Sequence, residues 1–425
     1  MGEVLMNMDA KIINGYNYAR EYFSELGVDV DRALATLDSI PISMHCWQGD
    51  DFHALDGQGA LSGGIAVTGN HPGCPRNVDE LRADIVKAVS LIPGPTKLNL
   101  HSSYAQLGNR KRDRDAYTIE DFAEWVDFAK QNNMGLDFNP TFFSHPNMDG
   151  NFTLASQNDK VRRFWIEHGK RCREIGQEMG RQIGQKCIVD YWMPDGFKDT
   201  PADGLSYRKR MLASLDEIFA EKMDDRYIDE AIESKLFGFG IESFTVASHE
   251  FALGYAITRK KAYCLDCGHF HPTEDMSDKI SSMMQYIDHL LIHTSRGVRW
   301  DSDHVVTYDD GLKKLMREVV AGNYLDRVYI AQDYFDGSMN RIACWTVAMR
   351  NTRKALLYAL LEPRATITAY EESGDFSARF VGQEAFRTAP VGAIWDYYCA
   401  SHNYPTSSSL WEEISKYDRE VLSKR

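Results

Sequence analysis

The chain has 425 residues, of which 48 are basic and 62 are acidic, so its formal net charge is −14 at pH 7. Nucleic-acid binding depends on cationic patches, and this acidic balance argues against it. The sequence contains neither a cationic leader followed by an apolar segment nor a run of about 18 uncharged apolar residues, so we expect a cytoplasmic protein without a membrane span.

Eight short apolar runs, each followed by polar or turn residues, predict eight β-strands. In chain order they are 42–46, 98–101, 136–139, 187–192, 228–234, 262–266, 290–293 and 328–333. Almost continuous apolar strands are typical of a parallel sheet that is covered on both faces.

Helical patterns fill most of the gaps between these strands. The predicted helices are 78–91, a stripe that follows Thr118, 159–183, 207–223, 251–260, 276–289, 311–321 and 339–361. Strands that alternate with helices eight times predict an α/β fold, a (β/α)8 TIM barrel over residues 38–361. Residues 1–37 are expected to form an N-terminal helical cap. Residues 362–425 are expected to form a C-terminal helical arm, for which an oligomer contact and a solvated tail are the alternatives.

Four strands in succession end on a side chain that can bind a metal ion. These are Glu233, Asp266, His293 and Asp333, spaced 33, 27 and 40 positions apart. Buried carboxylates are costly unless a cation neutralises them. Because a barrel of this class keeps its chemistry at the carboxyl ends of its strands, we expect the four side chains to hold one ion.

A second ion is predicted beside the first. Asp301 and Asp303 stand two residues apart, so in extended backbone they project to the same side. His269 follows Asp266 across a glycine, and Asp266 could bridge both ions. Two ions at such a site can clamp two oxygens of one substrate. The alternative is that individual acids cap the helices that follow the strands.

Four further side chains are candidates for substrate contact. Lys235 lies two residues after Glu233 and could polarise a substrate oxygen, or it could form a structural ion pair with the metal-binding acids. His101 and Trp192 end other strands and point toward the same mouth. Trp47 and Trp192 offer a flat apolar wall for a sugar, although plain core packing also explains them.

Several of these segments resemble the L-rhamnose isomerase family. The likeness extends from about residue 25 to the end of the chain. The residues that carry it are 43–51 (SMHCWQGDD), 91–95 (LIPGP), 136–140 (LDFNP), 233–238 (ESKLFG), 268–274 (GHFHPTE) and 299–306 (RWDSDHVV).

This resemblance implies a metal-dependent aldose–ketose isomerase that interconverts L-rhamnose and L-rhamnulose in rhamnose catabolism. It implies two divalent ions per subunit, manganese before cobalt, zinc or magnesium, and a homotetramer. By position, Glu233, Asp266, His293 and Asp333 match the family's first metal site. His269, Asp301 and Asp303, with Asp266 shared, match the second. Lys235 and His101 match substrate-contacting positions.

The expected reaction moves hydrogen between C1 and C2 of the open-chain sugar, with Lys235 stabilising negative charge on a sugar oxygen and Asp333 exchanging a hydroxyl proton. A hydride shift and an enediol route both remain open. An isomerase or epimerase that acts mainly on another aldose is the nearest alternative. A two-metal hydrolase is disfavoured because His45 is followed by Cys46 and Trp47 rather than by a second histidine at position 47. A non-catalytic sugar-binding or metal-binding protein would not need Lys235.

Overall fold

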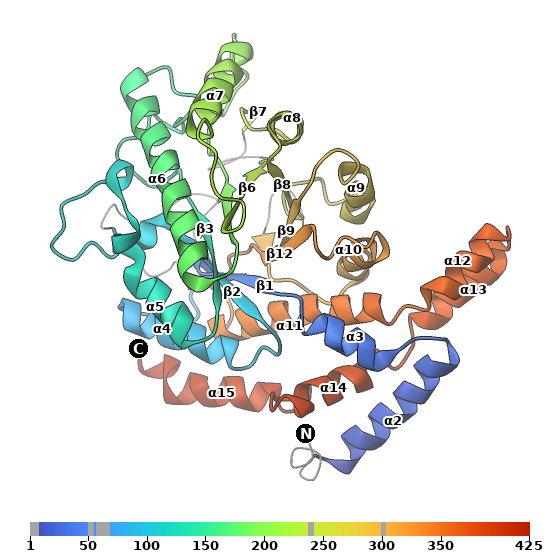
Figure 1. Cartoon of the computed structure of the whole chain (residues 1–425). Helices are drawn as coiled ribbons and strands as arrows, with labels where there is room; N and C mark the ends of the chain where they lie inside the picture. The colour runs from blue at the N-terminus through green and yellow to red at the C-terminus, as the bar shows by residue number, and fades with distance from the viewer. Residues whose placement is uncertain (1–7, 50–54, 57–68, 237–241, 299–302) are drawn as a thin grey trace.

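A computed structural model of the chain describes residues 8–49, 55–56, 69–236, 242–298 and 303–425. Eight strands close a parallel barrel in the order β1–β12–β9–β8–β6–β4–β3–β2 (Figure 1). They are β1 (Ile42–His45), β2 (Thr96–His101), β3 (Gly135–Asn139), β4 (Cys187–Tyr191), β6 (Ile228–Glu233), β8 (Ala262–Asp266), β9 (Leu290–Thr294) and β12 (Val328–Gln332). The predicted barrel is therefore confirmed, with each strand within about two residues of its expected place.

Helices cover the outside of the barrel. They are α4 (Val78–Val89), α5 (Ala123–Gln131), α6 (Asp159–Ile183), α7 (Gly204–Ile218), α8 (His249–Arg259), α9 (Met276–Met283), α10 (Asp310–Ala321) and α11 (Arg341–Leu360). Many begin just after an Asp or Asn whose side chain accepts from the first turn, as Asn77 does for α4 and Asp309 for α10. Such caps satisfy backbone N–H groups that the helix itself leaves unpaired.

The predicted carboxyl ends of two helices are wrong. In each case an arginine from another part of the chain donates to backbone carbonyl groups where the helix ends or just beyond it. Helix α7 ends at Ile218 rather than at 223, and Arg173 donates to the carbonyl oxygens of Ile218 (2.6 Å) and Glu221 (2.8 Å). Helix α9 ends at Met283 rather than at 289, and Arg327 donates to the carbonyl oxygen of Ile287 (2.7 Å). The guanidinium groups thus stabilise the turns that lead into β6 and β9.

The terminal helices lie on one side of the barrel. Helix α2 (Ala10–Glu25) packs against α14 (Val391–Ser401), and α3 (Val30–Leu37) packs against α11. The other α-helices in the described ranges are α12 (Arg364–Glu372), α13 (Phe376–Phe386) and α15 (Leu410–Glu420), and the α12–α13 hairpin extends away from the barrel (Figure 1). Within the described residues, no helix is both long enough and apolar enough to cross a membrane.

A small apolar layer fills the barrel interior below its carboxyl end. Its members are Ile188, Ala231, Ala262, Cys264, Leu291 and Ala331. Side chains alternate along a strand, so the residues two positions later on each strand also face the interior. For Ala231, Leu291 and Ala331 these are Glu233, His293 and Asp333, and for Cys264 it is Asp266. Strand periodicity alone therefore directs the four predicted metal ligands to a common centre.

Candidate metal centre

The first donor cluster gathers around the imidazole of His293. Its Nδ1 lies 3.5 Å from Oε1 of Glu233, 3.4 Å from Oδ2 of Asp266 and 3.5 Å from Oδ2 of Asp333. Donor atoms that bind one ion at about 2.1 Å with nearly tetrahedral angles lie about 3.4 Å apart. The spacing around Nδ1 therefore suits a single first-row divalent ion at the centre of the cluster.

The hydrogen bonding of this cluster also suits a cation. Among the described residues, Oε1 of Glu233, Oδ2 of Asp266 and Nδ1 of His293 are buried without a hydrogen-bond partner. Burial, together with the neighbouring carboxylates Asp266 and Glu233, raises the pKa of Asp333 to about 6. Unpaired buried acceptors that crowd one point are unfavourable unless a proton or a metal ion joins them.

The second donor cluster comprises Asp266, His269 and Asp303, with one donor atom of each within 4.8 Å of the others. Nδ1 of His269 donates to the carbonyl oxygen of Ser234 at 2.8 Å, and an imidazole that donates from one ring nitrogen can bind a metal ion through the other. Oδ1 of Asp266 accepts from the backbone N–H of Gly268 (2.6 Å) and from the hydroxyl of Ser295 (3.1 Å). Asp266 thus belongs to both clusters, as the bridging role predicted for it requires. Asp301 lies outside the described residues.

Glycine at position 268 allows the second cluster to form. A Cβ there would lie 2.0 Å from Oδ1 of Asp303 and 2.7 Å from Oγ of Ser295. Asp303 itself is carried by a two-stranded ribbon of β10 (Arg296–Gly297) and β11 (Asp303–His304). Any larger side chain at position 268 would separate Asp303 from Asp266.

An aromatic series lines the barrel mouth beside the first cluster. The indole Nε1 of Trp47 donates to Oδ1 of Asp333 at 2.7 Å, and the Trp47 ring lies 4.6 Å from that of His101. Phe143 contacts both His101 and Trp192 edge to face, with ring centroids 5.6 Å apart in each pair. The structure therefore brings Trp47, His101 and Trp192 together, and Phe143, which the sequence analysis missed, connects them.

Two titratable side chains at this mouth lie in well-defined surroundings. Burial lowers the pKa of His101 to about 3, so its imidazole is neutral at neutral pH, and its Nδ1 lies 3.0 Å from the hydroxyl of Thr141. Nζ of Lys235 lies 5.9 Å from the centre of the Trp192 ring. It pairs with Oε2 of Glu242 at 2.8 Å, a carboxylate outside the metal-ligand set.

A profile of the L-rhamnose isomerase family matches residues 10–425 of the chain. The chain is 52% identical to an L-rhamnose isomerase of Mannheimia succiniciproducens, over 96% of its own length and 98% of that protein. It is 48% identical to an L-rhamnose isomerase of Escherichia coli O127:H6, over 98% of its own length and all of that protein (100%). The chain belongs to the L-rhamnose isomerase family.

Membership of this family makes the chain an isomerase of rhamnose metabolism. L-rhamnose isomerases depend on a metal, and the two donor clusters provide oxygen and nitrogen ligands for one. Among solved structures, an L-ribulose 3-epimerase covers 80% of the chain and 97% of its own, with 12% identity and a TM-score of 0.43. That likeness is too weak to bear on the reaction.

One more acid, which the pattern of strand ends does not single out, lies beside the first donor cluster. Asp190 on β4 is 1% exposed, and its Oδ2 lies 4.0 Å from Nε2 of His293. Burial and the charge of Glu233 raise the pKa of Asp190 well above its usual value. The predicted ligands end or follow their strands, whereas Asp190 lies within β4. It nevertheless stands two residues after Ile188 of the interior layer, so strand alternation turns it inward as well.

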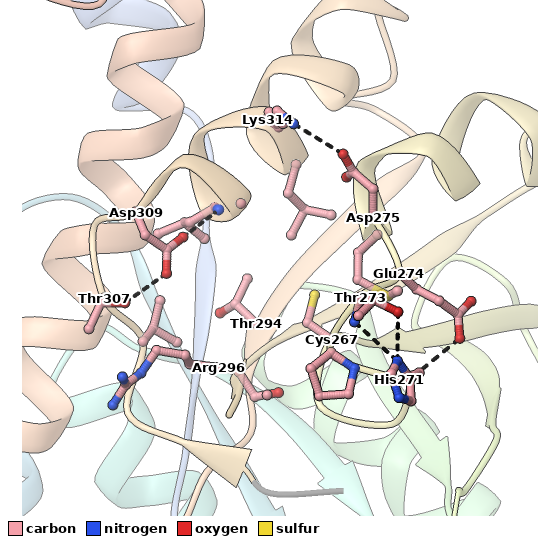
Figure 2. Close-up of a pocket in the computed structure, with 18 residues that line it drawn as sticks. Cys267, His271, Thr273, Glu274, Asp275, Thr294, Arg296, Thr307, Asp309 and Lys314 are labelled. Carbon is pink, nitrogen blue, oxygen red and sulfur yellow. Dashed lines mark hydrogen bonds and ion pairs between the residues drawn. The ribbon is translucent and has the colours of Figure 1, made fainter. Parts of the chain in front are cut away.

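A pocket of about 420 Å³ opens beside the second cluster, between the segments that contain α9 and α10 (Figure 2). Cys267, Thr294 and Ser295 line it next to the candidate metal ligands, and an ion pair between Lys314 and Asp275 (3.3 Å) lies at its edge. Because Ser295 also contacts Asp266, the pocket shares a wall with the candidate metal centre.

Proposed function

We propose that the chain interconverts L-rhamnose and L-rhamnulose by moving hydrogen between C1 and C2 at a two-metal site. The observation that carries this proposal is the arrangement around His293, whose Nδ1 lies 3.4–3.5 Å from three carboxylates. One of these, Asp266, also belongs to the second cluster. Two metal sites that share a ligand lie close together, so one ion can anchor the substrate while the other acts on its reacting oxygens. This arrangement suits a sugar, which offers several adjacent oxygens.

Each predicted ligand has a role in this proposal. The first ion would be held by Glu233, Asp266, His293 and Asp333. The second would be held by His269, Asp301 and Asp303, with Asp266 shared. Mixed carboxylate and imidazole ligands favour Mn²⁺, with Co²⁺, Zn²⁺ or Mg²⁺ as alternatives. When bound, the ions supply Lewis-acid stabilisation of negative charge on the sugar oxygens, worth several kcal/mol.

The protein's own groups orient the sugar and move protons. Lys235 directs a positive charge toward a sugar oxygen, and the carboxylate of Asp333 exchanges a hydroxyl proton. The neutral His101 offers a hydrogen bond without adding charge. Trp47 and Trp192 provide apolar faces against which the sugar carbon chain can pack. Glu233 lies close enough to the mouth to contact the substrate as well.

The decisive experiment adds Mn²⁺ and L-rhamnose to the purified protein and assays for new ketose. Asp301→Asn, with its fold verified by circular dichroism, should lose that signal if Asp301 holds the second ion. Unchanged turnover in this variant would contradict the assignment. Equal or faster reaction with another aldose would favour the alternative of a related sugar isomerase or epimerase. Substantial solvent deuterium at the product carbon in D₂O would exclude a purely intramolecular hydride shift.

We also propose that the chain works in the cytoplasm as a homotetramer. In this proposal residues 1–37 form a cap, residues 38–361 form the barrel and residues 362–425 form an arm. The α12–α13 hairpin supports an oligomer contact, because Phe376 and Phe380 are 59% and 61% exposed and Val381 is 66% exposed. Exposed apolar side chains that gather on one projecting element favour association. Sedimentation of the wild type and of Phe380→Asp would test this role, and an unchanged monomer in both would contradict it.

A further inference from the structure

A buried ion pair lies at the barrel mouth next to the metal ligands. Nζ of Lys235 donates to Oε2 of Glu242 at 2.8 Å and to the carbonyl oxygen of Pro194. The side chains of Lys235 and Glu242 are only 0% and 3% exposed. A charge pair so completely removed from water loses most of its hydration, and this cost is offset only by accurate geometry.

Three loops of the barrel meet at this ion pair. Glu242 lies in the segment after β6, and its Oε1 accepts from the side-chain amide of Asn151 at 3.1 Å, in the segment after β3. Pro194, which accepts from Lys235, follows β4. Next to it, Asp195 accepts from the backbone N–H groups of Thr153 (2.9 Å) and Ala155 (2.7 Å), which fixes the loop that carries Pro194.

The backbone beside Glu242 is shaped to admit its carboxylate. A Cβ at Gly196 would lie 2.5 Å from Oε2 of Glu242 and 2.7 Å from the carbonyl oxygen of Phe244. Gly196 pairs with Thr245 in the short ribbon of β5 (Gly196–Phe197) and β7 (Phe244–Thr245). The carboxylate therefore has a defined position, and so does the ammonium group that it binds.

Position distinguishes this pair from a second buried lysine–carboxylate pair of the barrel. Lys97 and Asp137 also form a buried ion pair, but Lys97 is the second residue of β2, and its Nζ also donates to the carbonyl oxygen of Lys186, just before β4 begins. Lys235 is two residues beyond Glu233 and faces Trp192 at the mouth. An ion pair that only stabilised the fold could lie anywhere in the barrel. The Lys235–Glu242 pair lies at the end where the sugar would bind, which favours a role in binding.

We propose that Glu242 is a positioning residue, which holds the Lys235 ammonium against the loop after β4 so that it faces the sugar oxygens. The proposal rests on the function proposed above. Glu242 touches neither substrate nor metal, and acts through Lys235. Misplacing a binding group by about 1 Å can lower the rate roughly a hundredfold. Loss of the Glu242 carboxylate is therefore expected to have a large effect on the rate.

A double-mutant cycle tests this role. Glu242→Gln should lower kcat/KM by roughly tenfold to a hundredfold, and Lys235→Met should lower it by at least as much. If Glu242 acts through Lys235, adding Glu242→Gln to Lys235→Met changes kcat/KM by less than about twofold, because the interaction is already absent. Full additivity of the two losses would overturn the proposal.

Two further measurements distinguish a positioning role of Glu242 from a purely structural one. Affinity for L-rhamnitol, the unreactive open-chain alditol, should fall about tenfold in Glu242→Gln, whereas Mn²⁺ affinity should change less than about twofold. Asp137→Asn is the matched control, since it breaks the corresponding pair at the other end of the barrel. It should lower Tm while leaving kcat/KM and alditol affinity within about twofold of wild type. Losses of alditol affinity that simply follow Tm in both variants would overturn the proposal.

If Glu242→Gln does not fold, Asn151→Ala replaces it, because that change loosens Glu242 without removing a charge. It should lower kcat/KM several-fold in the wild type and not in Lys235→Met, and a loss of equal size in both would overturn the proposal. Absence of L-rhamnose isomerisation in the wild type would instead refute the proposed function. Wild-type activity without coupling between positions 235 and 242 would refute this inference alone.

Discussion

The indole of Trp47 donates a hydrogen bond to Oδ1 of Asp333, 2.7 Å away, while Oδ2 of the same carboxylate faces Nδ1 of His293 at 3.5 Å. The end of β1 is thereby connected to a candidate metal ligand at the end of β12. One oxygen of Asp333 is held by the protein, and the other is directed into the first donor cluster. Outer hydrogen bonds of this kind fix the orientation of metal ligands.

Trp47→Phe should therefore weaken Mn²⁺ binding at the first cluster. Removing the donor lets the Asp333 carboxylate rotate, and loss of such a partner costs about tenfold to a hundredfold in metal affinity. Titration followed by the electron paramagnetic resonance signal of free Mn²⁺ measures the change. Trp165→Phe is the control, because the Trp165 indole donates to the carbonyl of Asn147, outside the donor clusters. Equal affinities in wild type and Trp47→Phe would contradict the role of this hydrogen bond.

Local patterns were sufficient to predict the barrel. Strand and helix periods differ, so the eight apolar runs and the stripes between them could be separated before any contact was known. The carboxyl ends of α7 and α9 could not be predicted, because Arg173 and Arg327 bind their last turns from distant parts of the chain. Such tertiary hydrogen bonds leave no trace in the local pattern.

The candidate site was predictable where it follows the alternation of a strand. Glu233, His293 and Asp333 face the interior because each stands two residues after an apolar member of the interior layer. Asp190 follows the same alternation, since it stands two residues after Ile188, but it lies within its strand rather than at the end. Glu242 has no such signal, since it lies in a loop and meets Lys235 only through the folded arrangement of three loops.

Acidification should weaken Mn²⁺ binding at the first cluster. Burial raises the pKa of Asp333 to about 6, so below that pH the carboxyl holds a proton that an ion must displace. The apparent dissociation constant should rise roughly tenfold per pH unit below 6. Titrations at pH 5, 6 and 7.5 measure this, and an affinity that does not change between pH 5 and 7.5 would contradict it.

The stability of the metal-free protein should respond to pH in the opposite direction through this group. An ordinary aspartate has a pKa of about 3.9 in the unfolded chain, so between pH 4 and 6 Asp333 binds its proton more tightly in the folded state. Through Asp333, lowering the pH from 7 to 5 therefore stabilises the metal-free fold while it disfavours the ion. Differential scanning calorimetry with and without Mn²⁺ should show the difference between the two Tm values decreasing as the pH falls.

Asp303→Asn should reduce the number of tightly bound Mn²⁺ ions from two to one per chain. Asp303 belongs only to the second cluster, so the ligands of the first remain intact. Metal analysis after desalting measures the stoichiometry. Asp309→Asn is the matched control, because Asp309 caps α10 by accepting from the backbone N–H of Leu312 at 2.9 Å. Two tightly bound ions in Asp303→Asn, or none, would contradict the division into two clusters.

Gly94→Ala should destabilise the fold more than Gly27→Ala does. Both glycines have positive φ, +87° and +77°, so each alanine pays about 1–2 kcal/mol for the left-handed backbone. Only at Gly94 would the new Cβ also meet a neighbour, 2.6 Å from Nη1 of Arg353.

Displacing Arg353 is the larger cost. Its buried guanidinium donates to the carbonyl oxygens of Leu37 and Ile40, both at 3.1 Å, and of Pro95 at 2.8 Å. Each buried carbonyl left without a donor costs about 1–3 kcal/mol. Thermal unfolding of the two Mn²⁺-loaded variants side by side should therefore give a clearly lower Tm for Gly94→Ala. Equal decreases in Tm would mean that the arginine adapts to the added methyl group and that these three hydrogen bonds contribute little.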